Sequence, residues 1–443
     1  MKNFREIEKD HCTSEHIACM LGMDSTQPDE LEIKTVAEAA KILKDERIFY
    51  SSLPDWIEAV RASVKKEDLV VLKGERRTPL NLGTRVHLYG DVTSARTRMK
   101  RKNALTELEL QRKAEPFAVI AYLMDAEYPK KFLDMSWEYL LKCHPHDSIA
   151  GTGIDQIETD MNYRLDQSRN ISAGIFRSSL QAIQKRIDNS DVEKDHVILT
   201  VFNPSPFPRT EVITAILDLP DFKQYEIWDA ANKKKMEYQE VCRYEHTPVI
   251  RHLGDSTMEM KALRTHLHLP IENVQAMGYK TFVIKPKNDF QRLDGSLVAA
   301  PNTMENENLK ATIHSNGTLD ITNKETGHTF FGLHYFEDSG EGGHAWRHVP
   351  PAFDRVINTL NSNPKIELLE SGPFLARYAV THLMEIPARL KEGKGDFVRR
   401  FDAEGDDASR SEIMKELTVK SELILRKGAR GLEIKTTFNK FDS

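Results

Sequence analysis

Residues 144–171, HPHDSIAGTGIDQIETDMNYRLDQSRNI, join a Pro- and Gly-rich elbow to a long stretch with helical periodicity. Apolar residues recur at an approximate 3.6-residue period after the elbow, which predicts a helix that continues to about Lys185. Thr152 and Asp155 have the spacing of a helix-capping signature, so this helix is expected to begin at Thr152. The elbow is therefore expected to be a turn between two helices.

Two more helical patterns precede the elbow, at residues 93–124 and 130–142. Long amphipathic helices bury their apolar stripes against one another, so a bundle is the simplest packing for the three segments. The sequence therefore predicts a three-helix bundle over residues 76–190.

The chain changes character near residue 190, where short β-branched runs begin to alternate with turn residues. The runs lie at residues 196–202, 212–219, 281–284, 310–313, 319–322, 375–382, 418–425 and 431–438. Asn316-Gly317, between two of them, is a strong hairpin signal. The pattern predicts an antiparallel β-sandwich over residues 191–443, incomplete because its last run is expected to leave an edge strand unpaired.

The first 75 residues follow a third pattern, of strand, helix, helix and strand, at residues 16–21, 36–43, 54–64 and 69–72. Thr35 and Glu38 form a capping box before the first of these helices. The order resembles the closing segment of an α/β sheet, so we expect residues 1–75 to be a remnant of an α/β domain. The whole chain is expected to be a multidomain α+β protein.

Length and charge exclude several classes of protein. A chain of 443 residues is too long for one hydrophobic core, and about three domains are expected. Its 62 basic and 68 acidic residues give a net charge of −6, so no general positive field attracts nucleic acid. The basic residues from Arg96 to Lys102 are followed by glutamates on the same predicted helix. They are interpreted as a solvated helix face.

Four cysteines, none in a C-x-x-C pair, favour a reducing compartment. The longest apolar run falls far short of the roughly 20 residues that a membrane-spanning helix needs. We therefore expect a cytoplasmic protein, or one exported by a signal that is not visible in this sequence, with neither a membrane nor a nucleic acid as its partner.

The elbow also carries the most unusual candidate chemistry in the chain. His146 and Asp147 offer a nitrogen and an oxygen ligand, which suit zinc or a similar divalent ion. The residues alone leave an alternative open, in which Asp147 or Thr152 caps the following helix and the histidines are ordinary elbow residues.

The same elbow resembles the middle-domain signature of glycoside hydrolase family 38, the retaining α-mannosidases, and above all their bacterial branch. Other stretches agree with the family in order, namely 72–76, 93–96, 100–103, Asn203-Pro204, 316–319 and the region from Glu337 to Pro351. The resemblance therefore spans nearly the whole chain. It implies the end of an α/β barrel, a three-helix bundle and part of a β-sandwich.

The resemblance also implies roles for individual residues. In the matching motif the second histidine binds the catalytic zinc and the next residue lines the sugar site, which assigns these roles to His146 and Asp147. Asp24, in the turn Gly22-Met23-Asp24, resembles the general acid that protonates the leaving glycosidic oxygen. The alternative is that Asp24 is a turn residue that satisfies local backbone amides.

The family's other zinc ligands and its nucleophile have no match in this sequence. The resemblance therefore implies a partial zinc site on a truncated or split chain that is inactive alone, with a second polypeptide carrying the missing barrel. The expected substrate is a mannose-containing oligosaccharide or a mannosylated small solute. The alternative is a non-catalytic carbohydrate-binding or scaffold protein derived from the family, and a homo-oligomer remains open.

Overall fold

The structure, a computed structural model, describes Glu6, Cys12, 14–20, Gln27, 29–44, 46–71, Lys73, 90–221, 224–251, 257–342, His348, 350–351, 353–391 and 409–439. These residues belong to two compact units, Met1–Asp91 and Val92–Ser443. The first predicted domain boundary, between residues 75 and 76, lies outside the described residues.

The N-terminal unit contains the helices α2 (Leu31–Ile42) and α3 (Leu53–Ser63) and a short 3₁₀ turn, η1 (Lys66–Asp68). Both helices were predicted, but the capping box at Thr35 was wrong. Asp29 Oδ1 accepts a hydrogen bond from the amide of Leu31 at 2.9 Å, so α2 begins before Thr35. At α3, Ser52 Oγ accepts from the amide of Asp55.

The two strands predicted in this unit are not formed by its described residues. Residues 14–20 are irregular, and the backbone carbonyl of His16 accepts a hydrogen bond from Trp56 Nε1 at 3.0 Å. Val70 and Val71 are about four-fifths exposed. These residues pair with no strand that the structure describes, and an apolar run alone does not make a buried strand.

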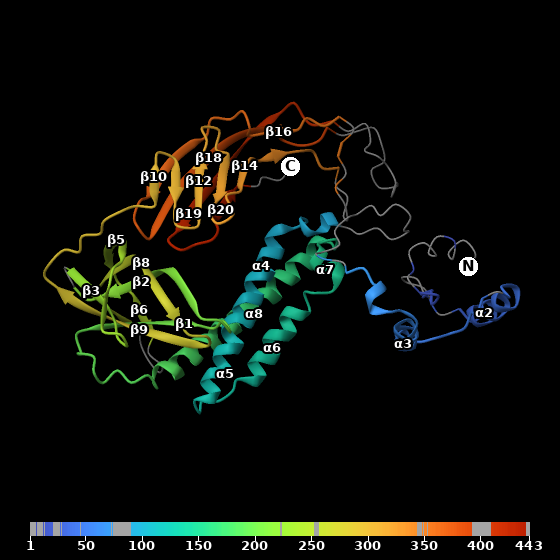
Figure 1. The fold of residues 1–443 in the computed structure, drawn as a ribbon, viewed down its shortest axis with the longest axis horizontal. Coiled ribbons are helices and arrows are strands. Elements are labelled where there is room, and N and C mark those ends of the chain that lie inside the picture. The colour runs from blue at the N-terminus through green and yellow to red at the C-terminus, as the bar shows by residue number, and fades with distance from the viewer. Residues whose placement is uncertain are drawn as a thin grey trace. The chain divides into compact units, whose positions relative to one another are not determined.

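The second unit begins with the predicted three-helix bundle (Figure 1). Its first rod comprises η2 (Gly90–Thr93), α4 (Thr97–Glu107), a π-helical segment η3 (Leu108–Ala114) and α5 (Glu115–Leu123). The other helices are α6 (Lys130–Leu141), the short α7 (His146–Ala150) and the long α8 (Asp155–Gln184). No helix among the described residues is long and apolar enough to cross a membrane.

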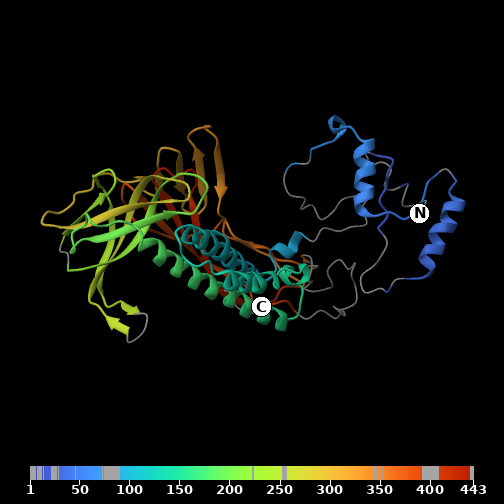
Figure 2. The same cartoon turned by 90° about the horizontal axis from the view of Figure 1, so that it is seen from below.

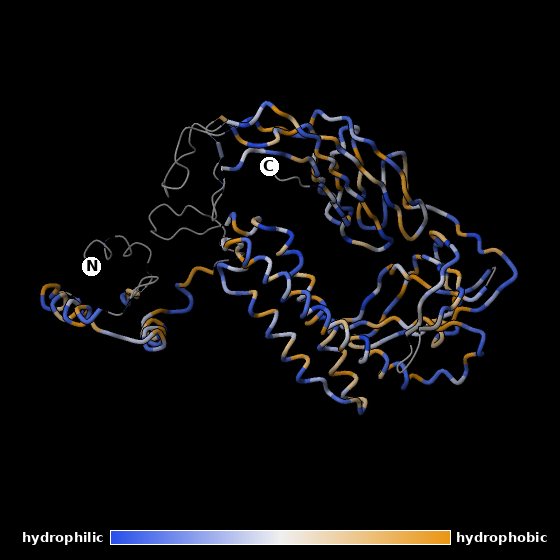
Figure 3. Tube along the Cα trace, turned by 180° about the vertical axis from the view of Figure 1, so that it is seen from behind, coloured by the Kyte–Doolittle hydropathy of each residue, from blue (hydrophilic) through white to orange (hydrophobic). Residues whose placement is uncertain are grey.

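The bundle core is built from apolar residues on the facing sides of these rods: Met99, Leu110, Ala114, Ala118, Leu133, Leu140, Cys143, Met161, Leu165 and Ile175. Hydrophobic and hydrophilic segments alternate along the rods in Figure 3, as expected for amphipathic helices. A polar layer crosses the core where Ser136 Oγ lies 2.9 Å from both Ser168 Oγ and Ser172 Oγ. These three serines satisfy one another away from water.

The residues after the bundle form two pairs of antiparallel β-sheets, and each pair has its own hydrophobic core. In the first, β1 (Val197–Asn203), β9 (Gly278–Lys287), β3 (Gln224–Asp229) and β4 (Lys234–Met236) pair in that order, and β2 (Arg209–Leu219), β8 (Ala262–Val274) and β5 (Gln239–His246) form the facing sheet. A separate hairpin comprises β6 (Val249–Arg251) and β7 (Thr257–Glu259). Leu217, Ile227, Leu267 and Phe282 lie in the core between the two sheets.

In the second pair of sheets, one sheet comprises β10 (Val298–Ala300), β11 (Thr303–Glu305), β12 (Leu309–Ile313), β13 (Leu319–Asn323) and β14 (Thr329–Leu333). The other sheet is β17 (Lys365–Glu370), β18 (Leu375–Pro387), β19 (Met414–Arg426) and β20 (Glu433–Phe438), and β15 (Glu337–Asp338) pairs with β16 (Ile357–Asn358). Figure 2 shows these strands from below. Every predicted strand in this half is confirmed, as is the turn at Gly317. Among the described strands, β20 pairs with β19 alone.

Candidate functional site

The elbow lies between α6 and α8 and contains the five-residue helix α7. Pro145 precedes α7, and Gly151 ends it in the left-handed conformation with φ of +84°. Glycine is the residue that adopts this conformation without strain, which explains why the turn can reverse here. A helix of one turn has little stability of its own, so its direction depends on contacts with its neighbours.

The two histidines of the elbow occupy different environments. His144 is 31% exposed, and its Nε2 lies 3.0 Å from Asn103 Oδ1 and 3.4 Å from Glu107 Oε1 on α4. His146 is 95% exposed, and its Nε2 lies 3.4 Å from Asp147 Oδ2. His144 therefore connects the elbow to α4, whereas the side chain of His146 is exposed to solvent.

Asp147 is also exposed, at 68% of its side chain. Thr152 donates to the Asp147 backbone carbonyl from its amide and its hydroxyl, and its Oγ1 lies 3.3 Å from Asp147 Oδ1. The structure thus overturns the interpretation that Asp147 or Thr152 caps α8. Ile154 precedes α8 without any side-chain cap, because Thr152 is bound back to α7.

His146 and Asp147 have the donor chemistry of a zinc site but not its number of ligands. Zinc in proteins takes three or four protein ligands of the N, O or S type. Among the described residues, the one group of three His, Cys, Asp or Glu side chains with converging ligand atoms lies elsewhere, at Glu193, Asp195 and His196. The described residues therefore do not complete a zinc site at the elbow.

The group at residues 193–196 lies in the connection from α8 to β1 and was not predicted from the sequence. His196 Nε2 is 3.7 Å from Glu193 Oε2 and 4.0 Å from Asp195 Oδ1. The two carboxylates are largely exposed, whereas the imidazole is 10% exposed. The E-x-D-H spacing is visible in the sequence, but exposed acidic side chains of this kind are common without a metal.

Asp24, the predicted general acid, lies outside the described residues. The basic residues of α4 are placed differently from the prediction. Arg98 and Arg101 are exposed, as expected for a solvated face. Arg96 and Lys100 are instead turned toward the elbow, where they bind its backbone carbonyls.

Residues 87–183, the rods and elbow of the bundle, match the model of the alpha mannosidase middle domain. A proposed mannosylglycerate hydrolase from Halalkalibacterium halodurans is 23% identical over 98% of this chain and 50% of its own length. The chain thus spans about half the length of the curated relative that it matches.

Two solved structures from Enterococcus faecalis share the fold. An alpha-mannosidase has a TM-score of 0.75 and 24% identity, covering 93% of this chain and 48% of its own. A protein in glycosyl hydrolase family 38 has a TM-score of 0.74 and 23% identity, covering 99% of this chain and 52% of its own.

The fold and the matched bundle first define a class: multidomain proteins in which an alpha-mannosidase middle domain is followed by antiparallel β-domains. Within that class, the chain is similar in fold to an alpha-mannosidase and to a protein in glycosyl hydrolase family 38, and its bundle matches the alpha mannosidase middle domain.

Proposed function

We propose that the chain serves in the hydrolysis of terminal α-mannosides, as part of a family 38 glycosidase. The observation that carries the proposal is the elbow itself, which presents His146 and Asp147 side by side and exposed within the matched middle domain. The named activities of the relatives, alpha-mannosidase and mannosylglycerate hydrolase, support a mannoside as substrate. A mannosylated small solute is the narrower proposal.

In this proposal Asp147 accepts hydrogen bonds from sugar hydroxyls, and His146 is one ligand of a zinc ion. Zinc would supply Lewis-acid stabilisation of the bound sugar. Because the elbow offers one of its ligands, His146, the remaining ligands would come from outside the described residues. A cytoplasmic location and a second polypeptide that completes the site belong to the same proposal.

The proposed reaction is retaining, with Asp24 as the general acid. Retaining glycosidases place an acid and a carboxylate nucleophile about 5–5.5 Å apart, and the acid must remain protonated until it protonates the leaving group. The nucleophile would be contributed by the part of the enzyme that completes the site.

The test is an assay of the full chain with a chromogenic α-mannoside, alone and with any companion polypeptide, in the presence of Zn²⁺ or a chelator. His146→Ala is expected to abolish most metal-dependent turnover and to lower bound zinc. His328→Ala, which removes an exposed histidine on the second pair of sheets, is the matched control. Unchanged zinc content and turnover in His146→Ala would refute the ligand assignment.

A second candidate function is mannoside binding without hydrolysis. It is favoured by the single carboxylate, Asp147, that the described elbow presents. Calorimetry with methyl α-mannoside distinguishes the two candidates, because a binding protein would take up the sugar without turnover in any combination of chains. In that case Asp147→Asn should weaken binding.

A further inference from the structure

Four polar residues at the start of the first rod contact the elbow segment: Arg96, Lys100, Asn103 and Glu107. Lys100, Asn103 and Glu107 share one face of α4, since they are three and four residues apart, and Arg96 directly precedes the helix. Each of the four contacts the segment from His144 to Glu158. We call these four residues the α4 stripe.

Arg96 makes the most contacts of the stripe. Its Nε donates to the carbonyl of Gly151 at 3.0 Å, and its Nη2 donates to the carbonyl of Gly153 at 2.9 Å. Its guanidinium also pairs with Asp155 and Glu158 in the first turn of α8. A guanidinium presents its donors in a fixed plane, so Arg96 fixes the end of α7 and the start of α8 together.

The backbone at Arg96 is itself constrained. Its φ of 46° and ψ of 47° lie in the left-handed region, which non-glycine residues rarely adopt. Such a conformation persists where surrounding contacts over-determine it. Here the aliphatic part of Arg96 packs on Gly151, since a Cβ added to that glycine would lie 3.3 Å from Arg96 Cγ and Cδ.

Lys100 supports the same end of α7. Its Nζ donates to the carbonyl of Ala150 at 3.0 Å, and also to that of Ala95. Burial and the nearby charge of Arg96 lower the pKa of Lys100. Two cations thus satisfy carbonyls at the C-terminus of α7, where a helix leaves its carbonyls without partners and favours positive charge.

We propose that Arg96 is a positioning residue, which sets the direction in which α7 presents His146 and Asp147. The contacts of α7 with α4 bracket these two side chains, with His144 on one side and Arg96 with Lys100 on the other. A five-residue helix cannot maintain that direction by itself. This inference rests on the proposed function to the extent that His146 and Asp147 contact substrate.

The test compares Arg96→Met, which keeps much of the aliphatic stem, with Arg96→Lys, which keeps the charge but not the planar fork. Lys102→Met is the matched control. Lys102 also joins α4 to α8, through the carbonyl of Asn162 and the carboxylate of Asp166, but it does not contact the elbow. All variants are made in the full chain, and their unfolding midpoints are measured first.

The first readout does not depend on activity. In hydrogen exchange, the amides of Ile149, Gly151 and Thr152, which are bonded within the elbow, should exchange on the order of tenfold faster in Arg96→Met. Lys102→Met should leave them unchanged. Wild-type protection in Arg96→Met would overturn the proposal, even if the chain proves to have no mannosidase activity.

The second readout is hydrolysis of the chromogenic α-mannoside by the active assembly. Misplaced positioning groups cost on the order of ten- to a hundredfold, so kcat should fall in Arg96→Met and recover in part in Arg96→Lys. The control should keep its kcat and KM within about twofold. If Arg96→Met and Lys102→Met lose the same activity, Arg96 is merely structural and the proposal fails. If wild type hydrolyses no mannoside, the proposed function fails and the exchange experiment alone decides the role of Arg96.

Discussion

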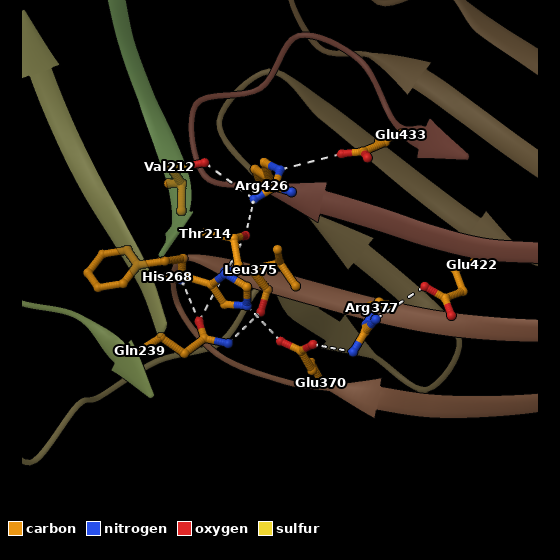
Figure 4. A network of polar contacts seen from close by, with 11 residues as sticks. Val212, Thr214, Gln239, His268, Glu370, Leu375, Arg377, Glu422, Arg426 and Glu433 are labelled. Carbon is orange, nitrogen blue, oxygen red and sulfur yellow. Dashed lines mark hydrogen bonds and ion pairs between the residues drawn. The ribbon is translucent and has the colours of Figure 1, made fainter. Parts of the chain in front are cut away.

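His268 Nε2 lies 2.8 Å from Glu370 Oε2, and this contact joins the two pairs of β-sheets (Figure 4). His268 is on β8 and Glu370 ends β17, and their side chains are 5% and 11% exposed. Thr214 Oγ1 lies 3.1 Å from the other ring nitrogen, and Arg377 Nη2 lies 2.5 Å from Glu370 Oε1. Both carboxylate oxygens of Glu370 thus have a partner, one in His268 and the other in Arg377. We call this contact between the two pairs of sheets the Glu370 joint.

The joint should weaken in acid. Burial alone would raise the pKa of Glu370, but the hydrogen bond to His268 and the charge of Arg377 outweigh it and lower the pKa below its usual value. A carboxyl group with a lowered folded-state pKa contributes stability above its unfolded pKa, and this is lost as pH falls through the folded pKa. The melting temperature of wild type should therefore fall more between about pH 5 and pH 3 than that of Glu370→Gln. Parallel melting curves would contradict this prediction.

Removing the carboxylate should be costly at neutral pH. Glu370→Ala leaves His268 Nε2 and Arg377 Nη2 without their carboxylate partner, although Arg377 keeps its ion pair with Glu422 through Nη1. Breaking a buried pair costs about 3–5 kcal/mol. Asp218→Asn is the control, because Asp218 and Arg264 form a partly exposed pair on β2 and β8. It should cost about 1 kcal/mol or less. Urea unfolding at pH 7 measures both, and equal losses would argue against a special role for the joint.

Gly317 should tolerate no side chain. Its φ is +82°, and a Cβ at this position would lie 2.6 Å from Nε2 of the fully buried His382. Gly317→Ala therefore combines left-handed strain with a steric clash and should cost more than about 2 kcal/mol. Gly327→Ala is the control, since its φ is +72° but nothing lies within 4 Å of the added carbon. It should cost about 1 kcal/mol. Similar unfolding midpoints for the two variants would show that the clash is relieved.

Two histidines of the second pair of sheets, His334 and His382, should make the stability of the fold depend on pH in a separate range. Burial lowers the pKa of His334, and burial together with the nearby His334 lowers the pKa of His382. A base whose folded pKa is depressed stabilises the fold above its unfolded pKa, near 6.5, and that stability is lost as pH falls below it.

We expect the melting temperature of wild type to fall between about pH 7 and pH 5.5, before carboxylates titrate. His334→Gln can keep a hydrogen bond to Ser421, which lies 2.9 Å from His334 Nε2, and it cannot be protonated. The melting temperature of His334→Gln should therefore fall less than that of wild type over this pH interval. A slope as steep as that of wild type would exclude His334 as a source of the effect.

The sequence predicted the elements whose patterns are local. The 3.6-residue period gave the bundle, and β-branched runs bounded by turns gave strands such as β12 and β18. It missed β8 (Ala262–Val274), because Arg264, His266 and His268 interrupt the apolar pattern of that strand. His268 is polar for a reason that is not local, since its partner Glu370 is 102 residues away.

The candidate site residues could be predicted where several of them lie together in one sequence motif. The H-P-H-D elbow was recognisable, but the sequence did not show that one histidine faces inward and the other outward. It also suggested that Arg96 and Lys100 are solvated. In the structure both bind backbone carbonyls of the elbow, and Arg96 also pairs with the carboxylates of Asp155 and Glu158. Carbonyl acceptors are present in every residue, so no side-chain pattern reports them.

The two elbow histidines should therefore differ in what they contribute to folding. His144→Ala removes the partner of the buried Asn103 Oδ1 and should cost about 1–2 kcal/mol. His146→Ala removes a side chain that is 95% exposed and should change stability by less than about 0.5 kcal/mol. Urea unfolding of the full chain measures both. A large loss for His146→Ala would mean that the ring has a structural contact, whereas an unchanged midpoint allows any loss of zinc binding or turnover in that variant to be attributed to the imidazole itself.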